Sequence, residues 1–192
     1  MPLNIPVILG TVRTQRVGPR VAKFIVRTLQ ERGHAPTLVD PVEFPLPLLD
    51  KMYKEHPAGQ APPVLERVAQ IIKAADGYVI VSAEYNHSIP PALSNLLDHF
   101  LEEYFFKPSA IVCYSPGPFG GVRAAMQLRA MLAELGMASI PSLLPFPKVQ
   151  ELLDENGTPQ NDRVKKSADR FLSEFEWHAE ALRAQRAKGR PY

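Results

Sequence analysis

The chain has 192 residues, 45% of them apolar, which is typical of one globular domain with a buried core. Its 22 basic and 20 acidic residues leave a net charge of +2, which argues against a disordered chain and a strongly basic nucleic-acid-binding protein. A single cysteine, Cys113, excludes an internal disulfide framework and a cysteine-based metal centre. We therefore predict no metal site.

No apolar run approaches the roughly 20 residues that a membrane-spanning helix needs. Residues 1–6 lack the basic and apolar regions of a secretory signal. We expect a soluble cytoplasmic protein that binds neither membranes nor nucleic acid.

The chain begins with a predicted strand and helix. An apolar run over residues 5–10 ends in glycine and is typical of a strand buried on both faces. A helix is predicted to follow this strand, and Gly33 stands where the C-cap of that helix would lie. That helix is predicted over 18–32 from apolar residues at helical spacing, namely Val21, Phe24, Ile25 and Leu29.

The next segment is rich in proline, a residue that makes up 20 of the 192 positions, about twice the usual share. A short strand over residues 37–39 precedes it. We interpret residues 41–63 as an ordered surface loop, because its apolar side chains need a surface to cover.

The rest of the chain alternates between helical and strand patterns. Apolar side chains at helical spacing predict helices over residues 63–75, 91–104, 121–135 and 162 to about 188. Continuous apolar runs predict strands over residues 77–82, 109–114 and 138–143.

This alternation is typical of an α/β fold with a doubly wound parallel sheet and helices on both faces. No repeat or break in composition marks a second domain, so we predict one domain over residues 1–192. The final helix leads into a basic tail over residues 183–192, which we expect to be solvated. We interpret Trp177 and His178, on that helix, as packing residues, and Cys113 as a small buried residue.

Three loops follow predicted strands at residues 10–17, 83–90 and 115–120, and all three have unusual compositions. In a doubly wound sheet, ligands bind beyond the carboxyl ends of the strands near the switch in strand order. The coincidence of three such loops is the strongest functional indication in the sequence.

The first loop, G-T-V-R-T-Q-R-V-G, joins a strand to a helix N-terminus, where backbone N–H groups and the helix dipole favour an anion. Thr11 and Thr14 offer hydroxyls, and Arg13 and Arg16 offer guanidinium groups suited to phosphate. The loop is neither a P-loop nor a dinucleotide fingerprint, so it favours a phosphate monoester. Taken alone, it is equally consistent with a helix start carrying two solvated arginines.

The second loop, A-E-Y-N-H-S-I-P-P, gathers donors, acceptors and an aromatic ring that suit the edge and face of a planar heterocycle. An ordinary polar turn before a helix is the alternative. The third loop, S-P-G-P-F-G-G-V-R-A, has three glycines that allow a close approach of the backbone to a ligand.

Together the three motifs resemble the NADPH-dependent FMN reductase family over residues 5–153. This flavodoxin-like group includes quinone, azo-dye, chromate and arsenical-resistance flavin reductases. The resemblance implies a flavodoxin-like sheet of five parallel strands, non-covalent FMN, and NADPH or NADH as co-substrate. It implies no essential catalytic side chain, since the cofactor performs the chemistry.

The resemblance also implies a set of flavin-binding residues. In the first loop, those at the FMN phosphate would be Thr11, Arg13, Arg16, Val17 and Gly18. In the second, those lining the isoalloxazine and ribityl groups would be Glu84, Tyr85, Asn86, His87 and Ser88. In the third, those closing the other side would be Ser115, Gly117, Gly120 and Gly121.

Four positions depart from the family pattern. Thr11 and Arg16 stand where the family has serine, so the first keeps a hydroxyl and the second adds a charge. Ala83 replaces a proline, and Ser94 replaces a lysine, so any contact that this lysine makes in relatives is missing here.

The implied activity is hydride transfer from NAD(P)H to the flavin and then reduction of a small-molecule acceptor, with ping-pong kinetics. A flavodoxin-type electron carrier is the first alternative, but carriers are generally acidic, and this chain has a pI near 8.7. A flavin-binding redox sensor is the second, although no effector module accompanies the domain.

We also expect a homodimer or homotetramer. The family assembles in this way, and the chain has two segments with many apolar side chains to cover. These are the aromatic run 104–106 and the loop 41–63, and large exposed apolar patches usually mark interfaces. The alternative is that these residues cover the core of their own chain.

Overall fold

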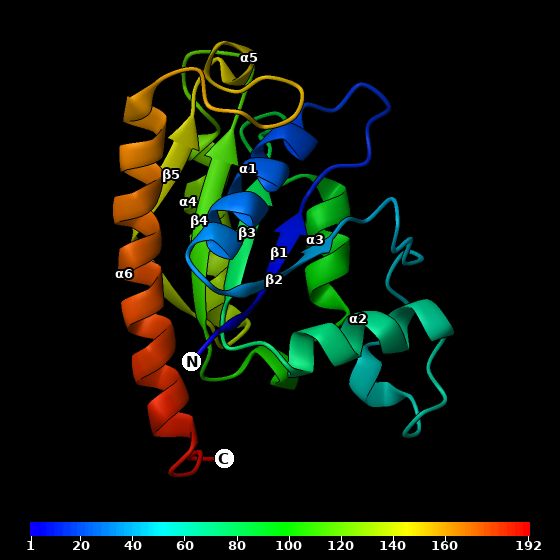
Figure 1. The fold of residues 1–192 in the computed structure, drawn as a ribbon. Coiled ribbons are helices and arrows are strands. Elements are labelled where there is room, and N and C mark those ends of the chain that lie inside the picture. Colours follow the sequence, from blue (N-terminus) through cyan, green and yellow to red (C-terminus); the bar gives the residue numbers. More distant parts are fainter.

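The computed structural model describes residues 1–192 and contains one sheet of five parallel strands in the order β2-β1-β3-β4-β5 (Figure 1). The chain first adds β2 beside β1, then crosses back and adds the other strands on the opposite side. This arrangement confirms the predicted doubly wound α/β fold and puts the switch in strand order between β1 and β3. The strands are β1 (Asn4–Leu9), β2 (Ala35–Val39), β3 (Tyr78–Ser82), β4 (Pro108–Tyr114) and β5 (Ala138–Phe146).

Helices cover both faces of the sheet (Figure 1). On one face, α1 (Gly18–Glu31) and α6 (Asp162–Arg186) enclose a cluster of 26 buried residues. On the other, α2, α3 and α4 enclose a cluster of 23, so both faces of the sheet are buried to a similar extent. The elements of this second face are α2 (Pro63–Lys73), α3 (Pro91–Asp98) and α4 (Val122–Glu134).

The continuous apolar runs of the sequence become the central strands. Every residue of β3 and β4 is buried, because helices cover both faces and neighbouring strands lie on both edges. The edge strand β2 instead alternates between exposed and partly buried residues over its first four positions, and only its last residue, Val39, is buried.

The predicted helix over 91–104 is too long. Helix α3 ends at Asp98, and the single 3-10 turn η2 (Glu102–Tyr104) follows it. The apolar pattern continues because this segment is buried, with the Tyr104 ring 5.3 Å from that of Tyr78. The helix stops where the carbonyl of His99 accepts a bond from the backbone N–H of Tyr53, at 2.7 Å, in the loop 41–63.

Two further differences from the prediction lie near the other edge of the sheet, one at the end of β5 and one just after it. Strand β5 continues three residues beyond the predicted end at 143, because Pro145 lies on an edge strand, where a missing N–H is tolerated. The sequence analysis also missed the single turn α5 (Val149–Leu152).

The loop 41–63 is ordered, as predicted, and contains the short 3-10 turn η1 (Tyr53–Glu55). Phe44 is buried against the second cluster, whereas Leu48 is 86% exposed and Leu49 is 41% exposed. The loop therefore covers the core only in part.

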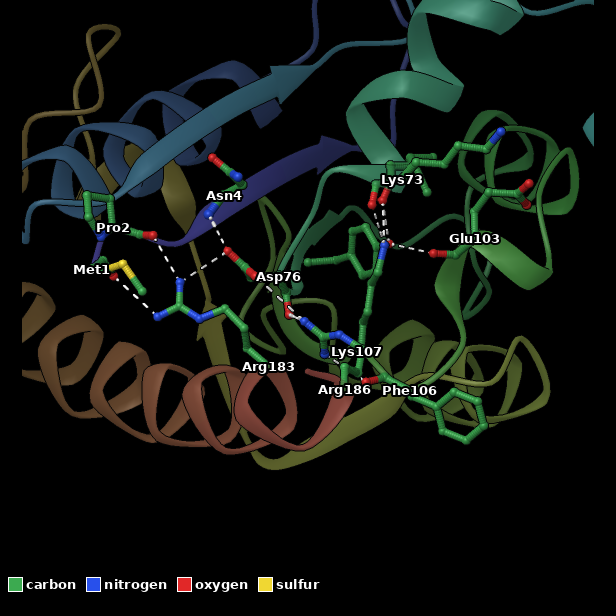
Figure 2. Close-up of polar contacts among 12 residues, drawn as sticks. Met1, Pro2, Asn4, Lys73, Asp76, Glu103, Phe106, Lys107, Arg183 and Arg186 are labelled. Atoms are coloured by element: carbon green, nitrogen blue, oxygen red, sulfur yellow. Dashed lines mark hydrogen bonds and ion pairs between the residues drawn. The ribbon is translucent and has the colours of Figure 1, made fainter. Parts of the chain in front are cut away.

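The expectation of a solvated basic tail is wrong for its first turns (Figure 2). The carboxylate of Asp76 accepts the N–H of Asn4 at 2.9 Å and pairs with Arg183 and Arg186 at 3.5 and 3.6 Å. Arg186 also donates to the carbonyl of Phe106 at 2.8 Å. Helix α6 is long enough to reach the amino ends of the strands, so its last arginines find acceptors there.

Two single-residue predictions have different outcomes. Cys113 is fully buried in β4, as predicted, and burial raises the pKa of its thiol to about 12. Trp177 does not pack in the core, because it is 69% exposed. It stands two positions after the buried Phe175, so it projects from nearly the opposite side of α6.

No helix combines the length and the apolar character required to span a bilayer. No group of three or more histidine, cysteine, aspartate or glutamate side chains is placed to hold a metal ion.

Candidate functional site

The three loops singled out in the sequence meet at the carboxyl ends of the adjacent strands β1, β3 and β4 (Figure 1). The Thr11 hydroxyl of the first loop lies 2.6 Å from the Tyr85 hydroxyl of the second. The Glu84 carboxylate of the second loop accepts the backbone N–H of Arg123, at 3.0 Å, just after the third. The loops thus lie next to one another at the switch in strand order, and hydrogen bonds link the second loop to the first loop and to the start of α4.

The first loop delivers a helix N-terminus close to the sheet. A Cβ on Gly18 would lie 2.3 Å from the Tyr114 hydroxyl, so glycine is required where α1 begins. Among residues 11–15, no backbone N–H donates to a protein acceptor. Five N–H groups without a protein acceptor, beside the N-terminus of a helix of 14 residues, are suited to an anion.

The two arginines of this loop have different surroundings. Arg16 forms a bidentate pair with Asp40, with both Nη–Oδ distances 2.6 Å, and its Nη1 also donates to the Thr11 carbonyl at 2.7 Å. Arg13 is exposed and has no acidic partner, and its guanidinium carbon lies 6.0 Å from the centre of the Tyr85 ring. Only Arg13 offers an unpaired charge.

The second loop contains a tight turn over residues 85–88. Tyr85 and Ser88 exchange two backbone hydrogen bonds, at 3.1 and 2.9 Å. Asn86 and His87, at the tip, have φ of 52° and 61°, the signature of a type I′ turn. Both side chains are exposed, and neither backbone N–H has a protein acceptor.

Helix α4 holds this turn in place. The Gln127 amide donates to the carbonyl of His87 at 2.9 Å and accepts the Ser88 hydroxyl at 2.7 Å. The Glu84 carboxylate caps the same helix, because it accepts the N–H groups of Arg123 and Ala124 at 3.0 and 3.3 Å. Glu84 is therefore engaged with the protein, whereas the tip of the turn is free.

The third loop depends on glycine for its shape. Gly120 and Gly121 have φ of 62° and 80°, and a Cβ on Gly121 would lie 2.8 Å from the Tyr114 carbonyl oxygen. The Ser115 hydroxyl donates to the carbonyl of Gly117 at 3.0 Å. Burial raises the pKa of the Tyr114 phenol, so this hydroxyl stays protonated.

The predicted site residues lie in these three loops or at the starts of the helices that follow them, and three further residues that the sequence analysis missed lie in or against the same loops. Asp40 pairs with Arg16, and Gln127 anchors the turn. The exposed ring of Phe119 stacks on the Arg123 guanidinium, 3.9 Å from its carbon. Asp40 could have been noticed in the sequence, because it is a polar residue directly after a predicted strand. No local feature of the sequence indicated Gln127.

Comparison with known proteins identifies the family. The NADPH-dependent FMN reductase family matches the chain over residues 3–151. The chain belongs to this family. An NAD(P)H-dependent FMN reductase of Schizosaccharomyces pombe is 30% identical over 195 residues, covering 92% of each chain. A quinone reductase of Pseudomonas putida is 28% identical over 179 residues, covering 90% of this chain and 92% of the relative.

Solved structures show the same fold. FerB of Paracoccus denitrificans, an NAD(P)H:acceptor oxidoreductase, has a TM-score of 0.72 at 19% identity, covering 92% of this chain and 97% of that one. Flavodoxin 1 of Bacillus cereus has a TM-score of 0.54 at 19% identity, covering 91% and 97%. The fold is therefore flavodoxin-like, as the motifs implied.

Family membership makes the chain an oxidoreductase with FMN as its flavin and NAD(P)H as its co-substrate. It confirms the predicted family, enzyme class and cofactors. The flavin-binding residues, the oligomeric state and the cytoplasmic location stay predictions.

Proposed function

We propose that residues 1–192 form one domain that holds FMN without a covalent bond at the carboxyl ends of β1, β3 and β4. There it transfers a hydride from NAD(P)H to the flavin and electrons onward to a small-molecule acceptor. The observation that carries this proposal is the group of unpaired N–H donors over residues 11–15, beside Arg13 at the start of α1. A phosphate monoester needs such donors and such a positive potential.

The residues of the first loop fit the FMN phosphate. Five backbone donors, the exposed Thr14 and the unpaired guanidinium of Arg13 supply hydrogen bonds and charge. Gly18 supports the site indirectly, because only glycine allows α1 to begin so close to the Tyr114 hydroxyl.

The second and third loops fit the two sides of the isoalloxazine ring. The free N–H groups of Asn86 and His87 are donors for the carbonyl oxygens of its pyrimidine edge. Because Gln127 and Glu84 tie this loop to α4, the donors are held in place before the ligand arrives. Phe119, stacked on Arg123, offers a flat surface at the rim for a planar substrate.

When bound, FMN supplies the chemistry by accepting a hydride from NAD(P)H and passing electrons to the acceptor. The protein binds and orients the two partners. We propose that NAD(P)H and the acceptor use the same open face in turn, which produces ping-pong kinetics.

An anaerobic titration tests the function. The purified protein, loaded with FMN, should lose the visible absorbance of its oxidised flavin on addition of NADPH, in proportion to the NADPH added. A quinone should then restore the absorbance, and initial rates at several quinone concentrations should give parallel double-reciprocal lines. A flavin that NADPH and NADH both leave oxidised would contradict the enzyme and favour an electron carrier or a sensor.

We also propose a homo-oligomer, a dimer or a tetramer. The exposed side chains of Leu48 and Leu49 support an interface on the loop 41–63. Phe105 and Phe106 support it less, because they pack against Tyr192 of their own chain, with ring centres 6.0 and 5.0 Å away. Light scattering should report at least twice the chain mass of 21.4 kDa, and Leu48→Glu should lower it, whereas a wild-type mass of 21.4 kDa contradicts the proposal.

A further inference from the structure

Arg16 is held in a largely enclosed position between the first loop and the end of β2. Its side chain is 16% exposed and that of Asp40 is 6% exposed. Three of its donors are already used, two by the Asp40 carboxylate and one by the Thr11 carbonyl. The cation is neutralised by its partner and presents little surface to a ligand.

Asp40 is itself fixed to the sheet. It follows β2, whose residue Val39 is in register with Ile8 of β1. Its Oδ1 accepts the N–H of Val42 at 3.0 Å, and its carbonyl accepts the N–H of Phe44 at 2.9 Å. The pair therefore connects the first loop to a rigid part of the fold.

The bond to Thr11 sets the direction of one of the loop donors, the N–H of Val12. In a trans peptide, the C=O and the following N–H point in opposite directions. Because Arg16 holds the Thr11 carbonyl on its own side, the N–H of Val12, which has no protein acceptor, points away from Arg16.

We propose that Arg16 and Asp40 are positioning residues, which fix the phosphate-binding loop from behind and do not themselves bind the phosphate. The inference rests on the proposed FMN site and replaces the expectation that both arginines contact the phosphate. Its basis is the bidentate pair, its burial and the bond to the Thr11 carbonyl. A loop ordered before the ligand arrives loses less conformational entropy on binding.

The Asp40→Ala variant distinguishes positioning from direct contact by the sign of its effect. If Arg16 bound the phosphate, loss of its carboxylate partner would free a cation and leave FMN affinity unchanged or higher. If the pair positions the loop, FMN affinity falls, and we expect a loss of roughly tenfold. Riboflavin has no phosphate, so its affinity should stay within about twofold of wild type.

Double variants make the assignment more specific. Arg16→Ala and Arg16→Ala/Asp40→Ala should weaken FMN about as much as Asp40→Ala alone, because all three break the same contact. Arg13→Ala is the matched control, since it removes a phosphate contact independent of Asp40. The factors by which Arg13→Ala and Asp40→Ala weaken FMN binding should therefore multiply, so that the combined variant binds FMN about a hundredfold more weakly than wild type.

The measurement is titration of the flavin-free proteins with FMN and with riboflavin, followed by flavin fluorescence, with the melting temperature of each variant recorded. Asp40→Asn keeps the shape of the side chain, and it takes the place of Asp40→Ala if that variant does not fold. We expect it too to weaken FMN but not riboflavin. Unchanged or tighter FMN binding on loss of the Asp40 charge would overturn the inference, whereas a wild-type protein that binds no FMN would overturn the proposed function.

Discussion

At the scale of single residues, Arg13 carries the only unpaired positive charge of the first loop. Its guanidinium lies above Tyr85 and has no carboxylate partner. A free, exposed arginine at the mouth of an anion site contributes through charge-assisted hydrogen bonds, which are stronger than neutral ones.

We therefore predict that Arg13→Ala lowers FMN affinity by about tenfold or more, because one such contact contributes about 1.5–3 kcal/mol. Riboflavin affinity should change little. Titration of the flavin-free proteins checks this, with Lys188→Ala, an exposed lysine just after α6, as a control that removes the same charge elsewhere. Equal losses for FMN and riboflavin would contradict the assignment.

Cys113 gives a second prediction at this scale. Burial, with a further contribution from Glu84, raises the pKa of its thiol to about 12, and only the thiolate is reactive. The native protein should resist a thiol reagent at pH 8, and one thiol per chain should react after unfolding in guanidinium chloride. Rapid reaction of the native protein would show that β4 opens under native conditions.

At the scale of elements, the turn 85–88 and the N-terminus of α4 form one unit. The turn needs two residues at positive φ, and α4 needs acceptors for its first N–H groups. Glu84 supplies the acceptors, and Gln127 returns a contact from the helix to the turn. Disturbing either part should therefore affect both.

The conformation of Asn86 can be separated from its side chain. Asn86→Ala should lower the free energy of unfolding by about 1 kcal/mol. Alanine is strained in the left-handed conformation that Asn86 adopts, which glycine and, to a lesser extent, asparagine and aspartate tolerate. Asn86→Gly should stay close to wild type in melting temperature and FMN affinity. If the glycine variant is stable yet binds FMN weakly, the side chain and not the backbone contacts the flavin.

The capping role of Glu84 is tested by stability. Glu84→Ala should lower the free energy of unfolding by about 1–2 kcal/mol, because two N–H groups of α4 lose their acceptor. Glu134→Ala, an exposed change at the other end of the helix, is the control. Denaturation in urea measures both variants, and similar stabilities for the two would argue against the cap.

At the scale of the whole molecule, the amino ends of the strands carry a second polar region, opposite the proposed flavin site at their carboxyl ends, and Figure 2 shows its contacts. The buried ammonium of Lys107 donates to the carbonyls of Ile72 and Lys73, at 2.8 and 3.0 Å, where α2 ends. Burial, reinforced by Arg186 and Arg190, lowers the pKa of Lys107 to about 8.

This buried lysine predicts a pH dependence of stability. Between about pH 8 and its ordinary value of 10.5, the unfolded chain holds a proton that the native chain has released, so stability rises with pH. Relative to Lys107→Met, which cannot titrate, wild type should gain up to about 3 kcal/mol across this range. Urea denaturation of both proteins at several pH values measures the gain, and a constant or falling difference would contradict the shift.

The sequence by itself determined the central strands, the order of the main elements and the three loops that follow β1, β3 and β4. These follow from local patterns, because a strand buried on both faces is a continuous apolar run and a loop after it lies at the carboxyl edge. The motifs in these loops were sufficient to predict the family. No structure was needed for the fold class.

Only the tertiary structure decided which charges are free and where an apolar pattern stops being helical. Arg16 and Arg13 look alike in sequence, but the end of β2 brings Asp40 to one of them and not to the other. Helix α3 ends at Asp98 although the apolar spacing continues, and the basic tail begins in ion pairs with Asp76. The reason is the same in each case: a hydrogen-bond partner or a covering surface comes from distant segments, and their positions are fixed only when the sheet has assembled.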